Sequence, residues 1–191
     1  MSGQKTVTPS AESIAASVNA SKPRGLPPVH LWNPPFCGDL DMRIARDGTW
    51  YYEGSVIERP GLVALFSSIL KKENGKYFLV TPVEKVGITV DDAPFVAVDF
   101  EVAGEGENQV LTFFTHVGDK ATASADLPIR VDHHAPTEEP SPYVRIRADL
   151  DALIDRKSFY RLVELGVHHD GWFGLWSSGA FFPIIPSADL P

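Results

Sequence analysis

Two stretches of this 191-residue chain repeat one pattern of residue types at nearly the same spacing. In each, an arginine is followed by apolar residues at helical spacing, and a glycine with alternating apolar residues comes 16 positions after the arginine in one copy and 15 in the other. The patterns are Ile57-x-Arg59-x-x-Leu62-x-x-Leu65 with Gly75-x-Tyr77-x-Leu79, and Ile154-x-Arg156-x-x-Phe159-x-x-Leu162 with Gly171-x-Phe173-x-Leu175. Each indicates a strand end, a helix, a tight turn and a strand, which predicts an internal duplication.

The remaining sequence favours short strands. Sixteen prolines and fifteen glycines interrupt the chain often, and Asp47-Gly48 between apolar segments is a strong hairpin signal. We therefore expect an α+β protein of two small, duplicated antiparallel β modules with one helix each, at residues 28–92 and 93–191. Residues 1–27 are expected to form an N-terminal arm containing a short helix over residues 10–20, capped by Ser10.

The spacing of apolar residues locates one helix in each module. The first is predicted to begin at Pro60, which suits a first helical turn, and to end near Asn74-Gly75. The second is predicted over residues 157–165, with Asp155 as its N-cap and Gly166 as its stop.

Composition excludes several classes of function. The formal net charge is −8 and no basic run is present, so neither nucleic acid nor an anionic membrane surface is an expected partner. The single cysteine, Cys37, excludes an intrachain disulfide. No signal peptide and no apolar stretch of roughly 20 residues is apparent, so we expect a cytoplasmic location.

Residue types that often carry catalysis or bind metals are present, but in unfavourable patterns. Adjacent histidines on a strand point to opposite faces, so the pairs at 133–134 and 168–169 predict no metal site. Cys37 lies among carboxylates, which raise rather than lower a thiol pKa, and we expect it to be a buried structural thiol. Nucleotide-binding and hydrolase motifs are absent, and we expect no cofactor.

Arginines are the better candidates for a binding site. Alternation along residues 143–147 predicts that Tyr143, Arg145 and Arg147 share one strand face, where they could bind phosphate or carboxylate. Alternatively, these arginines neutralise residues 91–127, which hold eight acidic residues and one lysine. Arg59 and Arg156 occupy matching positions in the two copies and either line a shared groove or stabilise their own helix starts.

Residues 28–100 and 142–184 resemble a bacterial family known as domain-of-unknown-function family 1285. The resemblance rests on FCGDLDMRI, DGTWYYEGSVIERPGLVALFSSIL, GKYFLVTPVEKVGITVDDAPFVAV and WSSGAFFPI. It implies a duplicated core whose C-terminal module looks like pleckstrin-homology folds, with a ligand or partner site between the modules and a signalling role. No activity and no catalytic residue follow from it.

The expected function is therefore that of a regulatory binding protein, with a site between the modules for a small anionic ligand or an acidic peptide. Asp91 is added to the candidate ligand-binding residues because it lies at the expected hinge between modules. Two alternatives remain: an enzyme that uses Asp91, Glu84 or Cys37 in the same crevice, and a protein-interaction scaffold.

Overall fold

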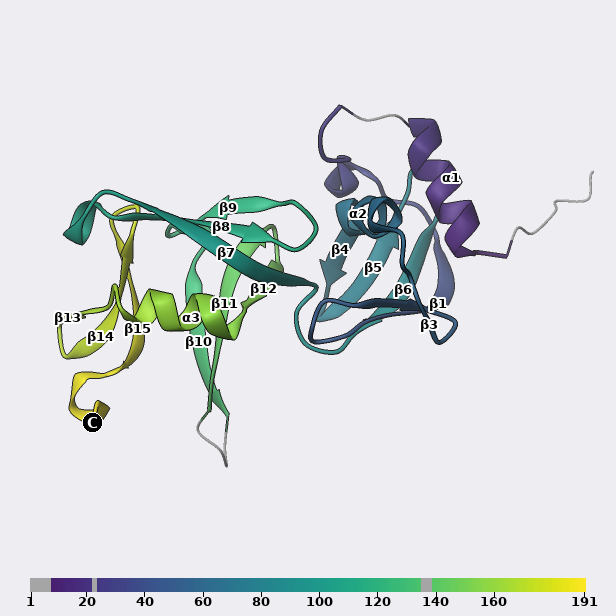
Figure 1. Cartoon of the computed structure of the whole chain (residues 1–191). Coiled ribbons are helices and arrows are strands. Elements are labelled where there is room, and N and C mark those ends of the chain that lie inside the picture. The colour runs from purple at the N-terminus through teal and green to yellow at the C-terminus, as the bar shows by residue number, and fades with distance from the viewer. Residues whose placement is uncertain (1–7, 22–23, 135–138) are drawn as a thin grey trace, which may run out of the picture. The chain divides into compact units, whose positions relative to one another are not determined.

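The computed structural model describes residues 8–21, 24–134 and 139–191 (Figure 1). The chain divides into two compact units: Met1–Ala45 with Thr49–Asp91, and Arg46–Gly48 with Asp92–Pro191. Each unit has its own sheet and buried core, so each is described by itself. In the described part of the chain, no helix is both long and apolar enough to cross a bilayer.

The first unit contains a six-stranded sheet and two α-helices. The strand order is β3-β2-β1-β6-β5-β4. The strands are β1 (Phe36–Ile44), β2 (Trp50–Tyr52), β3 (Ser55–Val56), β4 (Leu70–Glu73), β5 (Lys76–Val80) and β6 (Lys85–Val90). The helices are α1 (Ala11–Ser21) and α2 (Pro60–Ser68), with a short 3-10 helix, η1 (Val29–Leu31).

Helix α1 confirms the helix predicted in the N-terminal arm. The Ser10 hydroxyl accepts a hydrogen bond from the backbone N–H of Ser13 at 3.1 Å, as an N-cap residue does. Ile14 and Val18 lie one turn apart on the helix and are fully buried. Because α1 also packs against α2, the arm is part of the first unit's core.

Helix α2 begins at Pro60 as predicted, but it ends at Ser68. Residues 70–73 form β4 instead, so the longer predicted helix is wrong. Ile69 and Leu70 are both buried. Buried apolar residues fit a helix and a strand equally well, so the apolar spacing could not show where the helix ends. Asn74-Gly75, with φ of 50° and 77°, forms a two-residue turn, and antiparallel pairing of β4 with β5 takes over from the helix.

The second unit contains another six-stranded sheet, a three-stranded sheet and one α-helix. The larger sheet has the order β10-β11-β12-β7-β8-β9, and the smaller has β13-β14-β15. The larger sheet comprises β7 (Phe95–Ala103), β8 (Val110–Thr115), β9 (Lys120–Thr122), β10 (Ile129–His134), β11 (Glu139–Arg147) and β12 (Leu150–Ile154). The other elements are α3 (Arg156–Val163), β13 (Val167–His169), β14 (Trp172–Ser177), β15 (Ala180–Pro186), η2 (Gly106–Asn108) and η3 (Ser187–Asp189).

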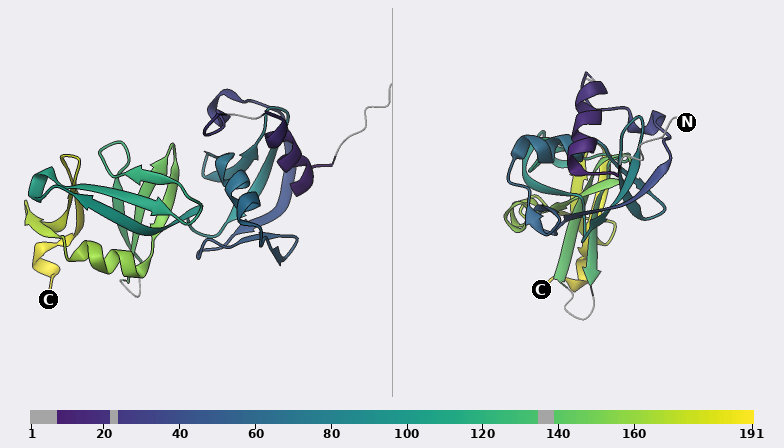
Figure 2. Two further views of the ribbon diagram at one scale, coloured as in Figure 1. Left: turned by 45° about the horizontal axis from the view of Figure 1, so that its top comes forward. Right: turned by 90° about the vertical axis from the view of Figure 1, so that its right-hand side faces the viewer.

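Helix α3 packs against β7 and β14, as Figures 1 and 2 show. Its N-cap is Asp155, whose carboxylate accepts a hydrogen bond from the Ser158 N–H at 2.9 Å, which confirms that prediction. Hydrogen bonds also join the smaller sheet to the larger one. The Ser177 hydroxyl accepts from the Leu111 N–H at 2.9 Å and donates to the Ala123 carbonyl at 2.7 Å.

The expectation of purely antiparallel modules is wrong. β1 pairs with β6 in parallel, and β12 pairs with β7 in parallel, so both six-stranded sheets are mixed. A parallel pair needs a long crossover rather than a tight turn. The alternating residue pattern records which side chains are buried and is the same for either direction of pairing, so it does not reveal such pairs.

The order of elements recurs in the two units. In the first, β3 is followed by α2, β4 and β5; in the second, β12 is followed by α3, β13 and β14. Each helix leads into an antiparallel hairpin whose two-residue turn has positive φ, at Asn74-Gly75 and Asp170-Gly171. The partners of the last strand differ: β5 continues into the large sheet through β6, while β14 pairs with β15 in the small one.

Candidate functional site

The candidate residues of the first unit do not form one cluster in the described structure. Arg59 is exposed and directly precedes α2. Asp91 follows β6 and forms an ion pair with Arg43, whose guanidinium lies 4.6 Å from the centre of the Tyr51 ring. The Asp91 carboxylate is therefore already neutralised by a neighbouring strand.

The two residues named for an enzymatic alternative also lie in the first unit. Glu84 is only 9% exposed, and burial raises its pKa although Ser13 donates a hydrogen bond to it. Cys37 is exposed, and its thiol donates to the Pro35 carbonyl at 3.3 Å. The expectation of a buried thiol is wrong because Cys37 lies at the irregular start of β1, where the pairing with β6 shifts register.

Tyr143 is buried in the second unit and is held on both sides. Its hydroxyl donates to Asp92 Oδ1 at 2.7 Å, and the Arg130 guanidinium lies 4.6 Å from the centre of its ring. Burial and the neighbouring Asp92 carboxylate raise the pKa of Tyr143 to about 12. The ring is 5% exposed, so its side chain serves packing in the present arrangement.

Arg145 and Arg147 meet different carboxylates. Arg145 Nε lies 2.6 Å from Asp151 Oδ1, whereas Arg147 Nη1 lies 2.7 Å from Asp119 Oδ2. The pairing of β11 with β12 shifts register between the two arginines, and such a β-bulge interrupts the alternation of side chains that the prediction assumed. Arg147 also lies over the Phe95 ring, at 5.1 Å from its centre.

The acidic partners bear on the two interpretations of Arg145 and Arg147, as anion-binding residues or as residues that neutralise the acidic segment 91–127. Asp119 belongs to the acidic segment 91–127, as the neutralisation reading requires for Arg147. Asp151, by contrast, lies outside that segment and is shared by Arg145 and Arg130. Anion binding by Tyr143, Arg145 and Arg147 stays a prediction, with partly buried ion pairs as its alternative.

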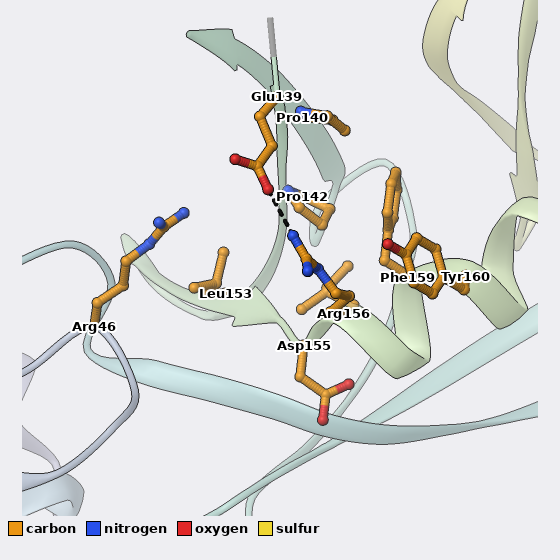
Figure 3. A pocket seen from close by; sticks show the side chains of 10 residues that line it. Arg46, Glu139, Pro140, Pro142, Leu153, Asp155, Arg156, Phe159 and Tyr160 are labelled. Atoms are coloured by element: carbon orange, nitrogen blue, oxygen red, sulfur yellow. Dashed lines mark hydrogen bonds and ion pairs between the residues drawn. The ribbon is translucent and has the colours of Figure 1, made fainter. Parts of the chain in front are cut away.

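Arg156 lines a cavity of about 300 Å³ beside the start of α3, which we call the α3 pocket (Figure 3). Its lining comes from the turn 46–48, β11, β12 and α3. The lining residues are Arg46, Glu139, Pro140, Pro142, Leu153, Ile154, Asp155, Arg156, Phe159 and Tyr160. The pocket thus combines two arginines with an apolar floor and two aromatic rings.

The two arginines differ in how they are held. Arg156 Nη2 lies 2.7 Å from Glu139 Oε1, and the two side chains are 72% and 63% exposed. Arg46 donates from Nε to Asp92 and from Nη2 to Ser141, both at 3.1 Å. In Figure 3 both guanidinium groups point toward the same side of the pocket, with Leu153 between them.

Asp155 has a structural role at the pocket's edge. Burial alone would raise its pKa, but hydrogen bonds from Ser158 and Lys157 outweigh that effect and hold the pKa below the usual value. Its charge occupies the N-terminus of α3, where a bound anion would otherwise be favoured. An anion in the pocket must therefore bind to the arginine side chains rather than to the helix end.

The histidines are occupied by other interactions. His133 Nε2 lies 2.9 Å from the Ile184 carbonyl, and His168 Nδ1 lies 2.8 Å from the Ser187 hydroxyl. The His169 ring packs on Trp176 and Phe181. Within the described ranges, no group of three or more His, Cys, Asp or Glu side chains could hold a metal ion.

Of the pocket residues, the sequence singled out Arg156 as a site residue and Asp155 as a helix cap. It did not single out Arg46, which lines the pocket and directly precedes the predicted Asp47-Gly48 turn. His116 Nε2 bonds the Gly48 carbonyl at 3.1 Å and helps to hold this turn in the second unit. No local sequence pattern predicts that contact, because it joins residues that lie 68 positions apart.

Comparison with known proteins gives consistent results. Residues 27–93 match the N-terminal domain of DUF1285, a domain of unknown function, and residues 94–184 match the C-terminal domain of DUF1285. No curated protein matches the chain.

Two solved structures are similar to it. A DUF1285 family protein from Silicibacter pomeroyi DSS-3 is 65% identical, with a TM-score of 0.87 over 92% of this chain and 96% of that one. A DUF1285 family protein from Shewanella baltica OS155 is 30% identical, with a TM-score of 0.53 over 65% of this chain and 91% of that one. Two domain matches that together span residues 27–184 establish that this chain belongs to the DUF1285 family.

Proposed function

We propose that this chain is a regulatory or signalling binding protein whose second unit takes the anionic group of a small ligand, or of a peptide, in the α3 pocket. The observation that carries the proposal is the position of Arg156. Its guanidinium reaches over an apolar cavity, and the partner that the described residues give it, Glu139, is itself exposed.

An incoming anion can replace Glu139. Ion pairs between exposed side chains contribute only about 0–1 kcal/mol, and both members of this pair are mostly exposed. A guanidinium binds carboxylate or phosphate through two parallel hydrogen bonds, which are stronger than a single one. Displacement of the Glu139 carboxylate should therefore cost a ligand carboxylate or phosphate little free energy.

The pocket walls support binding of more than a bare ion. Leu153, Pro142 and Phe159 supply apolar surface beside the arginines, and the Tyr160 side chain is 60% exposed at the rim. Most small-molecule sites have this composition, with apolar walls and a few convergent polar groups.

The charge state of the pocket favours binding over catalysis. Its two carboxylates, Glu139 and Asp155, each interact with a cation, and the pKa of Asp155 is lowered. A general acid or base works best with a pKa close to the working pH. Asp155, with its lowered pKa, lacks the raised value that such a role at neutral pH requires.

We also infer that the two units are related by duplication and that the second resembles pleckstrin-homology folds. Support for the duplication comes from the shared order of strand, helix and hairpin and from the matching turns at Asn74-Gly75 and Asp170-Gly171. The second unit's six consecutive strands followed by one helix fit the second part of this inference.

Isothermal titration of the full chain with inorganic phosphate, succinate and a tetraglutamate peptide tests the proposal. At least one should bind, and Arg156→Gln should weaken it by about tenfold to a hundredfold, the effect of losing one charge-assisted hydrogen bond. The matched control is Arg161→Gln, because Arg161 is an exposed arginine on the same helix, is paired with Asp99 and does not line the pocket. Equal affinities in the two variants would refute the proposal.

A further inference from the structure

A larger cavity, of about 830 Å³, lies next to the α3 pocket in the second unit. Eight of its eleven described lining residues carry hydrocarbon side chains: Pro140, Phe159, Val163, Phe173, Ile184, Ile185, Pro186 and Leu190. The other three are His133, His134 and Asp189. Since the His133 ring already bonds the Ile184 carbonyl, the lining presents mainly apolar surface to an occupant.

The two cavities adjoin each other along α3. Both are lined by Pro140 and Phe159. Arg156, Phe159 and Val163 follow one another at helical spacing, so they lie along one side of the helix. Arg156 lines only the α3 pocket and Val163 only the larger cavity, and about 10 Å of helix axis separates them.

A more specific assignment of the ligand rests on the proposed function of the α3 pocket. We propose that the ligand is an amphipathic anion, with a carboxylate or phosphate head at Arg156 and Arg46 and an alkyl or acyl chain in the larger cavity. The charges fix its direction, because the arginines lie at one end and the Asp189 carboxylate lines the other cavity.

The chemistry of the larger cavity favours a hydrocarbon chain over a peptide. A peptide brings an N–H and a carbonyl group with every residue, and each must find a hydrogen-bond partner when it is buried. Few polar side chains line this cavity in the part of the chain that the structure describes. An alkyl chain needs none, and each methylene that it buries tightens binding by about fourfold.

The test is isothermal titration of the full chain with butanoate, octanoate and dodecanoate, each below its micelle-forming concentration. Octanoate should bind up to about 250-fold more tightly than butanoate, since each of its four further methylenes can add about fourfold when buried. Octan-1-ol, which lacks the charge, should bind more weakly than octanoate.

Two variants separate the head from the chain. Arg156→Gln should weaken octanoate and dodecanoate about tenfold or more, with Arg161→Gln as its control. Val163→Phe should weaken dodecanoate and octanoate at least about tenfold but leave butanoate or phosphate unchanged, because it fills only the larger cavity. Its control is Glu164→Phe, at an exposed position that lines neither cavity. Ile185→Phe is the second variant of the larger cavity if Val163→Phe does not fold.

The outcomes distinguish the two proposals. Arg156-dependent binding of short anions without any gain from chain length would overturn the amphipathic ligand and leave the proposed function intact. A gain from chain length that Arg156→Gln does not reduce, with octan-1-ol equal to octanoate, would overturn both. So would the absence of binding by every anion tested. Tight binding of tetraglutamate with no effect of Val163→Phe or Ile185→Phe would assign the site to a peptide and overturn the amphipathic ligand.

Discussion

Arg156 Nη2 and Glu139 Oε1 lie 2.7 Å apart at the α3 pocket, although both side chains remain mostly exposed to solvent. Glu139 therefore occupies the position that a ligand anion would take. A weak intramolecular partner of this kind lowers the affinity for a ligand but keeps the guanidinium oriented in its absence.

Removing this competitor should strengthen anion binding. We expect Glu139→Gln to tighten binding of octanoate or phosphate about two- to fivefold. This factor corresponds to the free energy of an exposed ion pair, which the ligand no longer has to break. Asp126→Asn, an equal charge change at an exposed position outside the pocket, should have no such effect. Weaker binding to Glu139→Gln, measured by isothermal titration, would mean that Glu139 helps to hold the ligand.

Arg145 and Arg147 should act mainly on stability. The double variant Arg145→Ala/Arg147→Ala removes the ion pairs of Asp119 with Arg147 and of the largely buried Asp151 with Arg145. The free energy of unfolding should therefore fall by about 1–3 kcal/mol. In thermal-shift screening with nucleotides, sugar phosphates and dicarboxylates, each ligand should change the melting temperature equally in wild type and in the double variant. A ligand shift lost in the double variant, with its unliganded melting temperature nearly unchanged, would instead assign binding to the face predicted from the sequence.

Glu84 should make the first unit less stable at neutral pH. Burial raises its pKa, so the folded protein holds this proton more tightly than the unfolded chain does. Stability is therefore gained as pH falls through the raised folded value toward the unfolded value near 4.5. We expect Glu84→Gln to raise the melting temperature at pH 7 and to match wild type at pH 4. The corresponding gain in the free energy of unfolding at pH 7 should be no more than about 1.4 kcal/mol per unit of pKa shift. A lower melting temperature for Glu84→Gln at pH 7 would contradict this.

Protein purified without metal-affinity resin should contain no stoichiometric metal. The imidazoles of His133 and His168 bond a carbonyl and a hydroxyl, and the His169 ring packs between aromatic rings. Elemental analysis should find well below one zinc or iron per chain. About one equivalent would show that the chain rearranges to bind a metal ion.

Local sequence signals predicted the elements that local chemistry controls. Ser10 and Asp155 cap their helices because their side chains reach backbone N–H groups three residues away. Asn74-Gly75 turns where expected because a tight hairpin needs two residues with positive φ. These interactions involve a few neighbouring residues, so the sequence states them directly.

Features that depend on distant residues escaped prediction. The parallel pairs β1·β6 and β12·β7 depend on crossover connections, and the bulge between Arg145 and Arg147 depends on pairing with β12. The α3 pocket joins Arg46 to Glu139 and Phe159, which lie about a hundred residues further along the chain. A pocket assembled in this way follows from tertiary packing rather than from any motif.

Whether Arg156 anchors an anion at the α3 pocket is tested most directly by an NMR titration of the ¹⁵N-labelled chain with octanoate. The largest shifts should fall on the backbone amides of residues 153–160 and Glu139, with smaller ones at Val163 and Phe173. Arg156→Gln should abolish them at the same ligand concentration, and Arg161→Gln should preserve them. Shifts confined to other parts of the chain, or unaltered shifts in Arg156→Gln, would contradict the claim.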